Sequence, residues 1–167
     1  MNNFFWHEDF ADYPTNNAFF NPDKLYPEYP FGENLSAFPN QIYEMIRNLF
    51  IHLRLDSENI GKPVWNPLGE YIKHGDTVLI KPNMVKHENS TCKGKKGMEC
   101  LVTHPSVIRC ILDYVIIALG KTGKIVVADA PVQGCDFKKL KNSWGYDKIE
   151  KFYRENGILI SIDDLRD

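Results

Sequence analysis

Four polar segments in the middle of the chain carry side chains that suit anion binding and proton transfer. They are Lys81-Pro82-Asn83, Thr103-His104-Pro105, Asp129-Ala130-Pro131 and, shortly after, Gln133. Lysine brings a full positive charge, asparagine and glutamine bring donors and an acceptor, and threonine brings a hydroxyl. Histidine changes charge near neutral pH and can act as an acid, a base or a ligand. These residue types fit a site that binds phosphate or carboxylate and moves protons on it.

Our working hypothesis divides these residues into two roles. Proton transfer is assigned to His104 and Asp129, and substrate binding to Lys81, Asn83, Thr103 and Gln133. Structural alternatives stay open for every member of the set. Lys81 and Asp129 can pair with each other at a sheet edge, His104 can cap a helix, and Asn83 can fix a turn through its backbone. Gln133 is more often a turn residue than a catalytic one, so the residues alone do not establish that the protein is an enzyme.

Regular elements must bring these segments together. Short apolar runs predict three buried strands, at 77–80, 124–128 and 158–162. Apolar residues at helical spacing predict a helix over 105–119 and another over 143–156. Strands alternating with helices predict parallel pairing through right-handed crossovers, which is part of a doubly wound α/β sheet. Ligands of such sheets bind beyond the carboxyl ends of the strands, where the polar segments fall.

The rest of the chain predicts two regions. Residues 1–38 are rich in aromatic residues, Pro and Asn, and predict an irregular arm that packs through its rings or, alternatively, covers a substrate as a lid. Residues 39–167 read as the N-terminal part of the α/β domain and open with an amphipathic helix from Pro39. Three strands leave an unpaired edge and poorly covered faces, so we expect a truncated domain or one completed by forming a homo-oligomer.

Composition argues against several classes of partner. The 167 residues carry a formal net charge of −2, which gives no general attraction to nucleic acid or to an anionic membrane. No apolar run approaches the length of a membrane span, and the first residues do not form a signal peptide, so we expect a cytoplasmic protein. The partner expected from the polar segments is a small anionic molecule.

The spacing of the cysteines and the absence of several motifs argue against common cofactor sites and catalytic classes. The four cysteines, Cys92, Cys100, Cys110 and Cys135, show no Cys-x-x-Cys spacing, so we expect neither a thiolate zinc site nor an iron–sulfur cluster in this segment. The chain has no Gly-x-Gly-x-x-Gly fingerprint, no P-loop and no Gly-x-Ser-x-Gly elbow. The residues therefore assign no metal, and the cofactor stays unknown.

Several of these motifs together resemble the DUF362 family, a domain of unknown function. The likeness lies in Trp65-Asn66-Pro67-Leu68-Gly69, in the Lys-Pro-Asn and Thr-His-Pro segments, and in Asp129-Ala130-Pro131-Val132-Gln133. It covers residues 60–167 well and 26–60 more loosely. The aromatic arm and the Ala-Pro-x-Gln motif resemble those of a branch of the family that is encoded among bacterial polysaccharide-biosynthesis genes. The resemblance implies an α/β fold, usually in a longer chain, and some members carry an iron–sulfur domain elsewhere.

Three functional hypotheses follow from the residues and the resemblance. The first is an enzyme that acts on a small phosphorylated or carboxylated substrate at the carboxyl edge of the sheet. The second is a non-catalytic binding or scaffold module in a polysaccharide-biosynthesis pathway. The third is a redox protein whose iron–sulfur cluster lies outside this segment.

Overall fold

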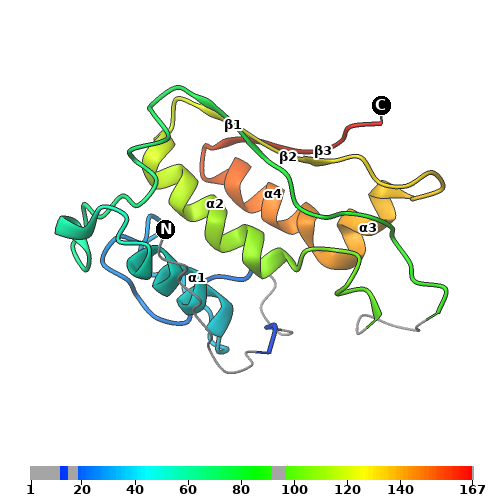
Figure 1. The fold of residues 1–167 in the computed structure, drawn as a ribbon, viewed down its shortest axis with the longest axis horizontal. Helices are drawn as coiled ribbons and strands as arrows, with labels where there is room; N and C mark the ends of the chain where they lie inside the picture. Colours follow the sequence, from blue (N-terminus) through cyan, green and yellow to red (C-terminus); the bar gives the residue numbers. More distant parts are fainter. Residues whose placement is uncertain (1–11, 15–18, 92–96, 167) are drawn as a thin grey trace, which may run out of the picture.

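Three parallel strands form one sheet, and the helices that connect them gather on a single side of it (Figure 1). The computed structural model describes residues 12–14, 19–91 and 97–166. In chain order the elements are α1 (Gln41–His52), the 3-10 helix η1 (Ser57–Asn59), β1 (Thr77–Ile80), α2 (Pro105–Leu119), β2 (Lys124–Asp129), α3 (Phe137–Trp144), α4 (Tyr146–Glu155) and β3 (Leu159–Asp164). The strand order is β1-β2-β3, which confirms the predicted α/β class.

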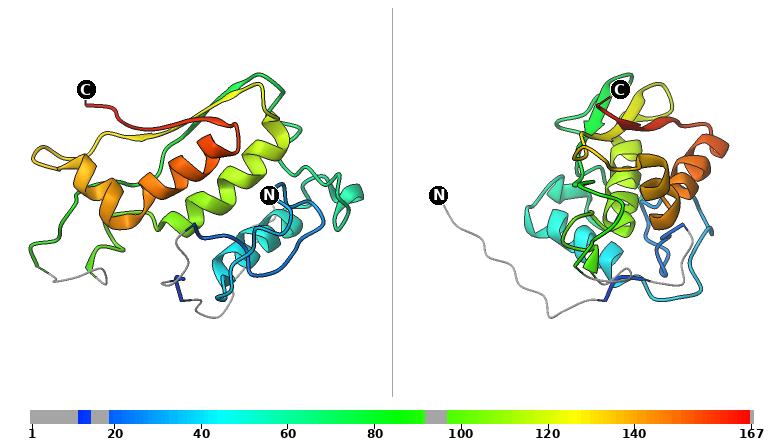
Figure 2. Two further views of the ribbon diagram at one scale, coloured as in Figure 1. Left: turned by 180° about the vertical axis from the view of Figure 1, so that it is seen from behind. Right: turned by 90° about the vertical axis from the view of Figure 1, so that its right-hand side faces the viewer.

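The two faces of the sheet differ because successive side chains of a strand point to opposite sides. On the covered face, Ile125 and Val127 of β2 and Ile160 of β3 are buried in a core shared with α2, α3 and α4. On the other face, Leu79 is 61% exposed and Leu159 is 62% exposed. Figures 1 and 2 agree that α2, α3 and α4 lie together beneath the sheet, and no helix in the described ranges covers the opposite face.

Helix α2 is the central element of the molecule and begins and ends where the sequence predicts. Pro105 occupies its first turn, where the missing N–H costs nothing, and Gly120 with φ of +68° ends it. Most of its side chains are buried, since the sheet packs on one side and α1 on the other. A helix that is apolar around most of its circumference is typical of such a sandwiched position.

Other element boundaries correct the sequence-based expectations. Most of the helix predicted over 143–156 is α4, and most of α3 was not predicted. The two helices are separated by Gly145, which adopts a left-handed φ of +83°. Asp136 begins α3 by accepting a hydrogen bond from the backbone N–H of Lys139. Helix α1 begins after Asn40, whose side chain caps it, rather than at Pro39. β2 and β3 each extend to an aspartate, one and two residues beyond the predicted ends.

The N-terminal segment packs against α1 and α2 rather than standing apart. Residues 19–38 contain no helix or strand, and Phe20 and Tyr29 are buried among the core residues. The Asn40 side-chain amide donates to the carbonyl oxygens of Phe20 at 2.9 Å and Asn21 at 3.0 Å, which ties the segment to the start of α1. Residues 1–11 and 15–18 of the predicted arm lie outside the described residues.

Candidate functional site

The clearest polar cluster lies where β1 and β2 end. The two strands pair in parallel, with Ile80 opposite Val127, so the residues that follow them meet at one edge of the sheet. Lys81 places its Nζ 2.9 Å from Oδ1 of Asp129. The other carboxylate oxygen of Asp129 accepts the backbone N–H of Met84 at 2.7 Å. Lys81 and Asp129 therefore form an ion pair at the sheet edge, which is the structural alternative that the sequence left open.

Asp129 is held in its ionised form by these donors. Its burial alone favours the neutral acid, but hydrogen bonds from Lys81 and from the backbone N–H groups of Met84 and Ala130 outweigh burial and lower the pKa of Asp129. A carboxylate with a lowered pKa is a weak base near neutral pH. The geometry therefore suits Asp129 to orienting Lys81 and the loop after β1.

Lys81 differs from its partner in its access to solvent. The Lys81 side chain is 61% exposed, whereas that of Asp129 is 10% exposed. An ammonium group has three donors, and Nζ of Lys81 meets Asp129 and, at 3.4 Å, the Pro82 carbonyl. The ammonium group of Lys81 is therefore open to an anion that approaches from solvent at the carboxyl edge.

Asn83 and Thr103 fasten two loops together at the same edge. The Asn83 N–H donates to the Thr103 hydroxyl oxygen at 2.9 Å, and the Thr103 N–H donates to the Asn83 carbonyl at 2.8 Å. The Thr103 carbonyl also accepts from the Tyr146 hydroxyl at 2.6 Å. Backbone groups make these bonds for Asn83, so its exposed side-chain amide is not used by them.

His104 serves as the N-cap of α2, and its ring contacts aromatic side chains. Its Nδ1 lies 2.8 Å from the Ser106 hydroxyl and accepts the Ser106 N–H. The ring stacks on Tyr13 at a centroid distance of 4.1 Å and meets Phe20 and Trp144 edge to face. None of these contacts joins His104 to Lys81 or Asp129 within the part of the chain that the structure describes.

Gln133 is exposed in a tight turn after β2. The Cys135 N–H donates to the Val132 carbonyl at 3.1 Å across this turn, and Gly134 has the positive φ of +81° that the turn requires. The guanidinium of Arg166 donates to the carbonyls of Val132 at 2.9 Å and Cys135 at 3.0 Å, so it fixes the turn to the end of β3. Sequence reasoning missed Arg166, although a lone arginine after a strand that ends in aspartates was a visible signal.

Of the six predicted site residues, the structure thus joins two pairs directly. Lys81 contacts Asp129, and Asn83 contacts Thr103. Gln133 lies on the neighbouring loop, whose Val132 N–H donates to the Val85 carbonyl at 3.1 Å. His104 follows Thr103 in the chain but turns its ring toward the aromatic side chains.

A second charged cluster lies inside the helical layer and was missed from the sequence. Arg109 and Asp113 of α2 form an ion pair in which neither side chain is exposed. Tyr153 and Tyr43 donate to the Asp113 carboxylate at 2.7 Å and 2.9 Å. Complete burial raises the pKa of Asp113, and Arg109 beside it opposes the rise. The signal was an Arg and an Asp at i, i+4 within an otherwise apolar helix.

The N-terminal segment completes this buried cluster. Nη2 of Arg109 donates to the Asn21 side chain at 3.1 Å and to the Tyr29 hydroxyl at 3.2 Å. The guanidinium also lies over the ring of Phe152 at 4.6 Å, which adds a cation–π contact. These contacts link the N-terminal segment to α2 and α4, so the cluster acts as a structural joint between them.

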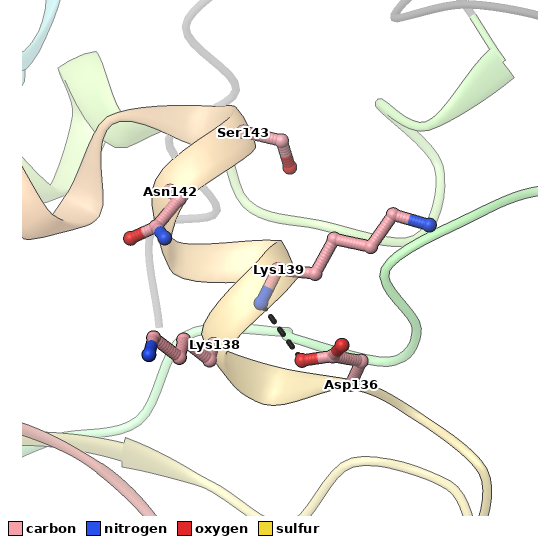
Figure 3. Close-up of a pocket in the computed structure, with 5 residues that line it drawn as sticks. All are labelled: Asp136, Lys138, Lys139, Asn142 and Ser143. Atoms are coloured by element: carbon pink, nitrogen blue, oxygen red, sulfur yellow. Dashed lines mark hydrogen bonds between the residues drawn. The ribbon is translucent and has the colours of Figure 1, made fainter.

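A surface hollow of about 520 Å³ lies along α3, apart from the Lys81–Asp129 pair (Figure 3). Figure 3 shows Lys138 and Asn142 leaving one side of the helix and Lys139 and Ser143 leaving the other. Asp136, at the start of the helix, already accepts the Lys139 N–H at 2.9 Å. These side chains diverge rather than converge, so the hollow gives no common point at which a ligand would be held.

Metal and thiol sites gain no support from the described residues. Across residues 12–14, 19–91 and 97–166, no three His, Cys, Asp or Glu side chains gather as metal ligands. Cys100, Cys110 and Cys135 are free thiols, and Cys110 is fully buried. Cys92, Lys93, Lys95 and Lys96 of the long loop after β1 lie outside the described residues. Within the described ranges, no helix combines the length and apolar character needed to cross a membrane.

Comparison with known proteins identifies one family. The model of a family described as "Domain of unknown function (DUF362)" matches residues 78–166, which include all three strands but for Thr77 and the whole of the candidate site. No curated protein and no solved structure matches the chain.

Proposed function

Because this chain belongs to the DUF362 family, whose function is unknown, we propose a function from the site itself: it binds a small anion at the carboxyl edge of its sheet, with Lys81 as the contacting cation. The observation that carries the proposal is the unequal exposure of the Lys81–Asp129 pair. The carboxylate is nearly buried and fixed, while the ammonium group is open to solvent. A solvent-exposed ammonium group that is positioned by a nearly buried carboxylate can bind phosphate or carboxylate.

Asp129 keeps its backbone hydrogen bonds when Lys81 turns to a ligand. Backbone N–H groups of Met84 and Ala130 also donate to its carboxylate, so movement of Lys81 does not leave a buried charge without donors. Binding therefore exchanges one anionic partner of Lys81 for another, at a small cost in the stability of the fold. The exposed amides of Asn83 and Gln133 lie on the two loops that flank the pair and supply further donors.

The sequence of the motif after β2 and the positive charge of Lys81 together favour one class of anion. The Ala130-Pro131-Val132-Gln133 segment resembles a branch linked to polysaccharide biosynthesis, which favours a phosphorylated or carboxylated sugar intermediate over a bare inorganic ion. Chemistry on the bound anion, with His104 or Asp129 moving protons, stays a prediction. Binding without catalysis in the same pathway shares this first step and is the alternative.

The experiment compares two single lysine variants by nuclear magnetic resonance. Inorganic phosphate, a sugar phosphate and a uronic acid are titrated into the protein, and backbone amide shifts of the loops after β1 and β2 are followed. Lys81→Met should reduce the affinity for the ligand about tenfold or more, which corresponds to loss of one charge-assisted contact of about 1.4 kcal/mol.

Lys138→Met is the matched control, since it removes an exposed lysine from the hollow along α3. It should leave the affinity unchanged. Equal loss in both variants would indicate general attraction to positive charge, and unchanged binding in a folded Lys81→Met protein would reject the site.

A further inference from the structure

The uncovered face of the sheet presents an apolar centre. By the strand register, Leu79 of β1 lies beside Val126 of β2, which lies beside Ser161 of β3. One row toward the amino ends, Lys124 lies between Thr77 and Leu159. We define the open face as Thr77, Leu79, Lys124, Val126, Leu159, Ser161 and Asp163. Ala128, which lies beside Asp163 on the same side of β2, is fully buried and is not part of it.

Parallel sheets occur almost always with both faces covered, because their strands are apolar on both sides. The open face departs from this rule, since Leu79 and Leu159 are each more than half exposed. Val126 of β2, the strand between them, lies beside Leu79. An exposed apolar patch of this kind marks an interaction site.

Charge on the open face identifies the partner that it fits. Among its strand positions two are charged, Lys124 at the amino end of β2 and Asp163 at the carboxyl end of β3. The Ser161 hydroxyl donates to Asp163 at 2.7 Å, which places both side chains on this face. Lys81, which follows β1 at the same edge, is paired with Asp129. One further cation and one anion at opposite ends of an apolar centre leave the surface without net charge, which suits neither nucleic acid nor an anionic membrane.

We propose that the open face binds the open face of a second copy of this chain, with the two sheets related by a two-fold axis that runs strands antiparallel. A two-fold interface must be self-complementary. Antiparallel strands bring the Lys124 end of each copy over the Asp163 end of the other, so the favourable charge contact forms twice. Strands running in the same direction would instead place Lys124 over its own equivalent, where the like charges repel.

The size of the face sets the strength of the association. Three strands about 4.8 Å apart with about five residues each give a footprint of roughly 250 Å² per copy. A stable complex buries about 800 Å² per partner. We therefore expect a weak dimer with a dissociation constant on the order of 0.1–1 mM.

The first test measures association across that range. Small-angle X-ray scattering at about 0.05 to 1 mM protein brackets the expected dissociation constant. The wild-type chain should pass from monomer to dimer, and Leu79→Lys should weaken dimerisation about tenfold or more. Val64→Lys is the control, because Val64 is also exposed but lies outside the sheet. A monomer at every concentration would overturn the proposal, as would equal weakening by both variants.

The second test addresses the orientation through charge reversal. Lys124→Glu and Asp163→Lys should each weaken the dimer, because each places like charges together at both ends. The double variant should recover the wild-type association, since the reversed charges again meet their opposites. An affinity of the double variant below that of both single variants would reject the antiparallel arrangement. Circular dichroism of the two single variants and the double variant checks that each protein keeps its fold.

Discussion

Two ion pairs of this chain occupy opposite environments. Lys81 and Asp129 meet at the carboxyl edge of the sheet, where the lysine is mostly in solvent. Arg109 and Asp113 meet inside the helical layer, where neither side chain reaches solvent. The pKa of Asp129 is lowered, because hydrogen bonds from Lys81 and two backbone N–H groups outweigh its burial. The pKa of Asp113 is raised, because its complete burial outweighs the arginine beside it.

The difference separates a pair that can exchange partners from one that cannot. Arg109 and Asp113 are fully buried, and Arg109 donates to Asn21 and Tyr29 of the N-terminal segment. Breaking that pair leaves a charge without water or a counter-charge. Breaking the Lys81–Asp129 contact leaves the lysine hydrated and the carboxylate bonded to backbone N–H groups. We therefore expect the buried pair to control folding and the edge pair to control ligand binding.

The largest effect should come from Arg109→Met. The substitution leaves the Asp113 carboxylate buried without its cation, which typically lowers the free energy of unfolding by about 3–5 kcal/mol. Urea denaturation followed by circular dichroism measures the loss. A loss below about 1 kcal/mol would show that the pair is dispensable, and the contrast between the two pairs would fail.

A double-mutant cycle sharpens that result. Arg109→Met with Asp113→Leu removes both charges at once, so no charge stays buried alone. The double variant should lose less free energy of unfolding than the sum of the two single losses. Additive losses would mean that the two side chains act independently.

Tyr153→Phe should have an intermediate effect. The Tyr153 hydroxyl donates to Asp113 at 2.7 Å and accepts from Arg109 at 2.6 Å, so its removal leaves both charges short of one partner. We expect the free energy of unfolding to fall by about 1–3 kcal/mol. Tyr71→Phe is the control, because Tyr71 is exposed, and it should change the unfolding midpoint little.

Asp129→Asn should have a smaller effect that depends on pH. The lowered pKa of the folded state means that ionised Asp129 stabilises the fold above its unfolded pKa of about 3.9. That stabilisation is lost as the pH falls through the lower pKa of the folded state. The variant should be about 1–2 kcal/mol less stable at neutral pH, and the difference should shrink below about pH 4. Urea unfolding of both proteins across this range measures it, and a difference independent of pH would contradict the assignment.

The smallest effect on stability should come from Lys81→Met. An exposed ion pair contributes about 0–1 kcal/mol, so the free energy of unfolding should stay within that range of the wild type. The same variant should lose anion affinity, which separates its role from that of Arg109. A large loss of stability would place the edge pair in the same class as the buried one.

The sequence was informative where one local pattern decides the structure. Apolar runs located all three strands, and Pro105 with Gly120 bounded α2. Parallel pairing then brought Lys81 and Asp129 to one edge, as the strand-end rule predicts. The break at Gly145 was missed, because a helical pattern continues on both sides of it.

Contacts between distant segments could not be predicted in this way. Residue spacing does not reveal that Tyr43 and Tyr153 would both turn to Asp113, since each lies on a different helix. The ring of His104 was likewise expected at the sheet edge, but Tyr13, Phe20 and Trp144 offer it an aromatic environment in the helical layer. Periodicity describes one element at a time, whereas these contacts depend on how elements pack.

The contact between Asn21 and Arg109 joins positions 88 residues apart, which has a consequence during protein synthesis. At about 5–20 residues per second, the ribosome delivers the arginine about 4–18 s after the asparagine. During that interval the aromatic N-terminal segment exists without the helix that later packs against it. Translation speed between these codons should therefore influence how much nascent chain is captured by chaperones or aggregates before it folds.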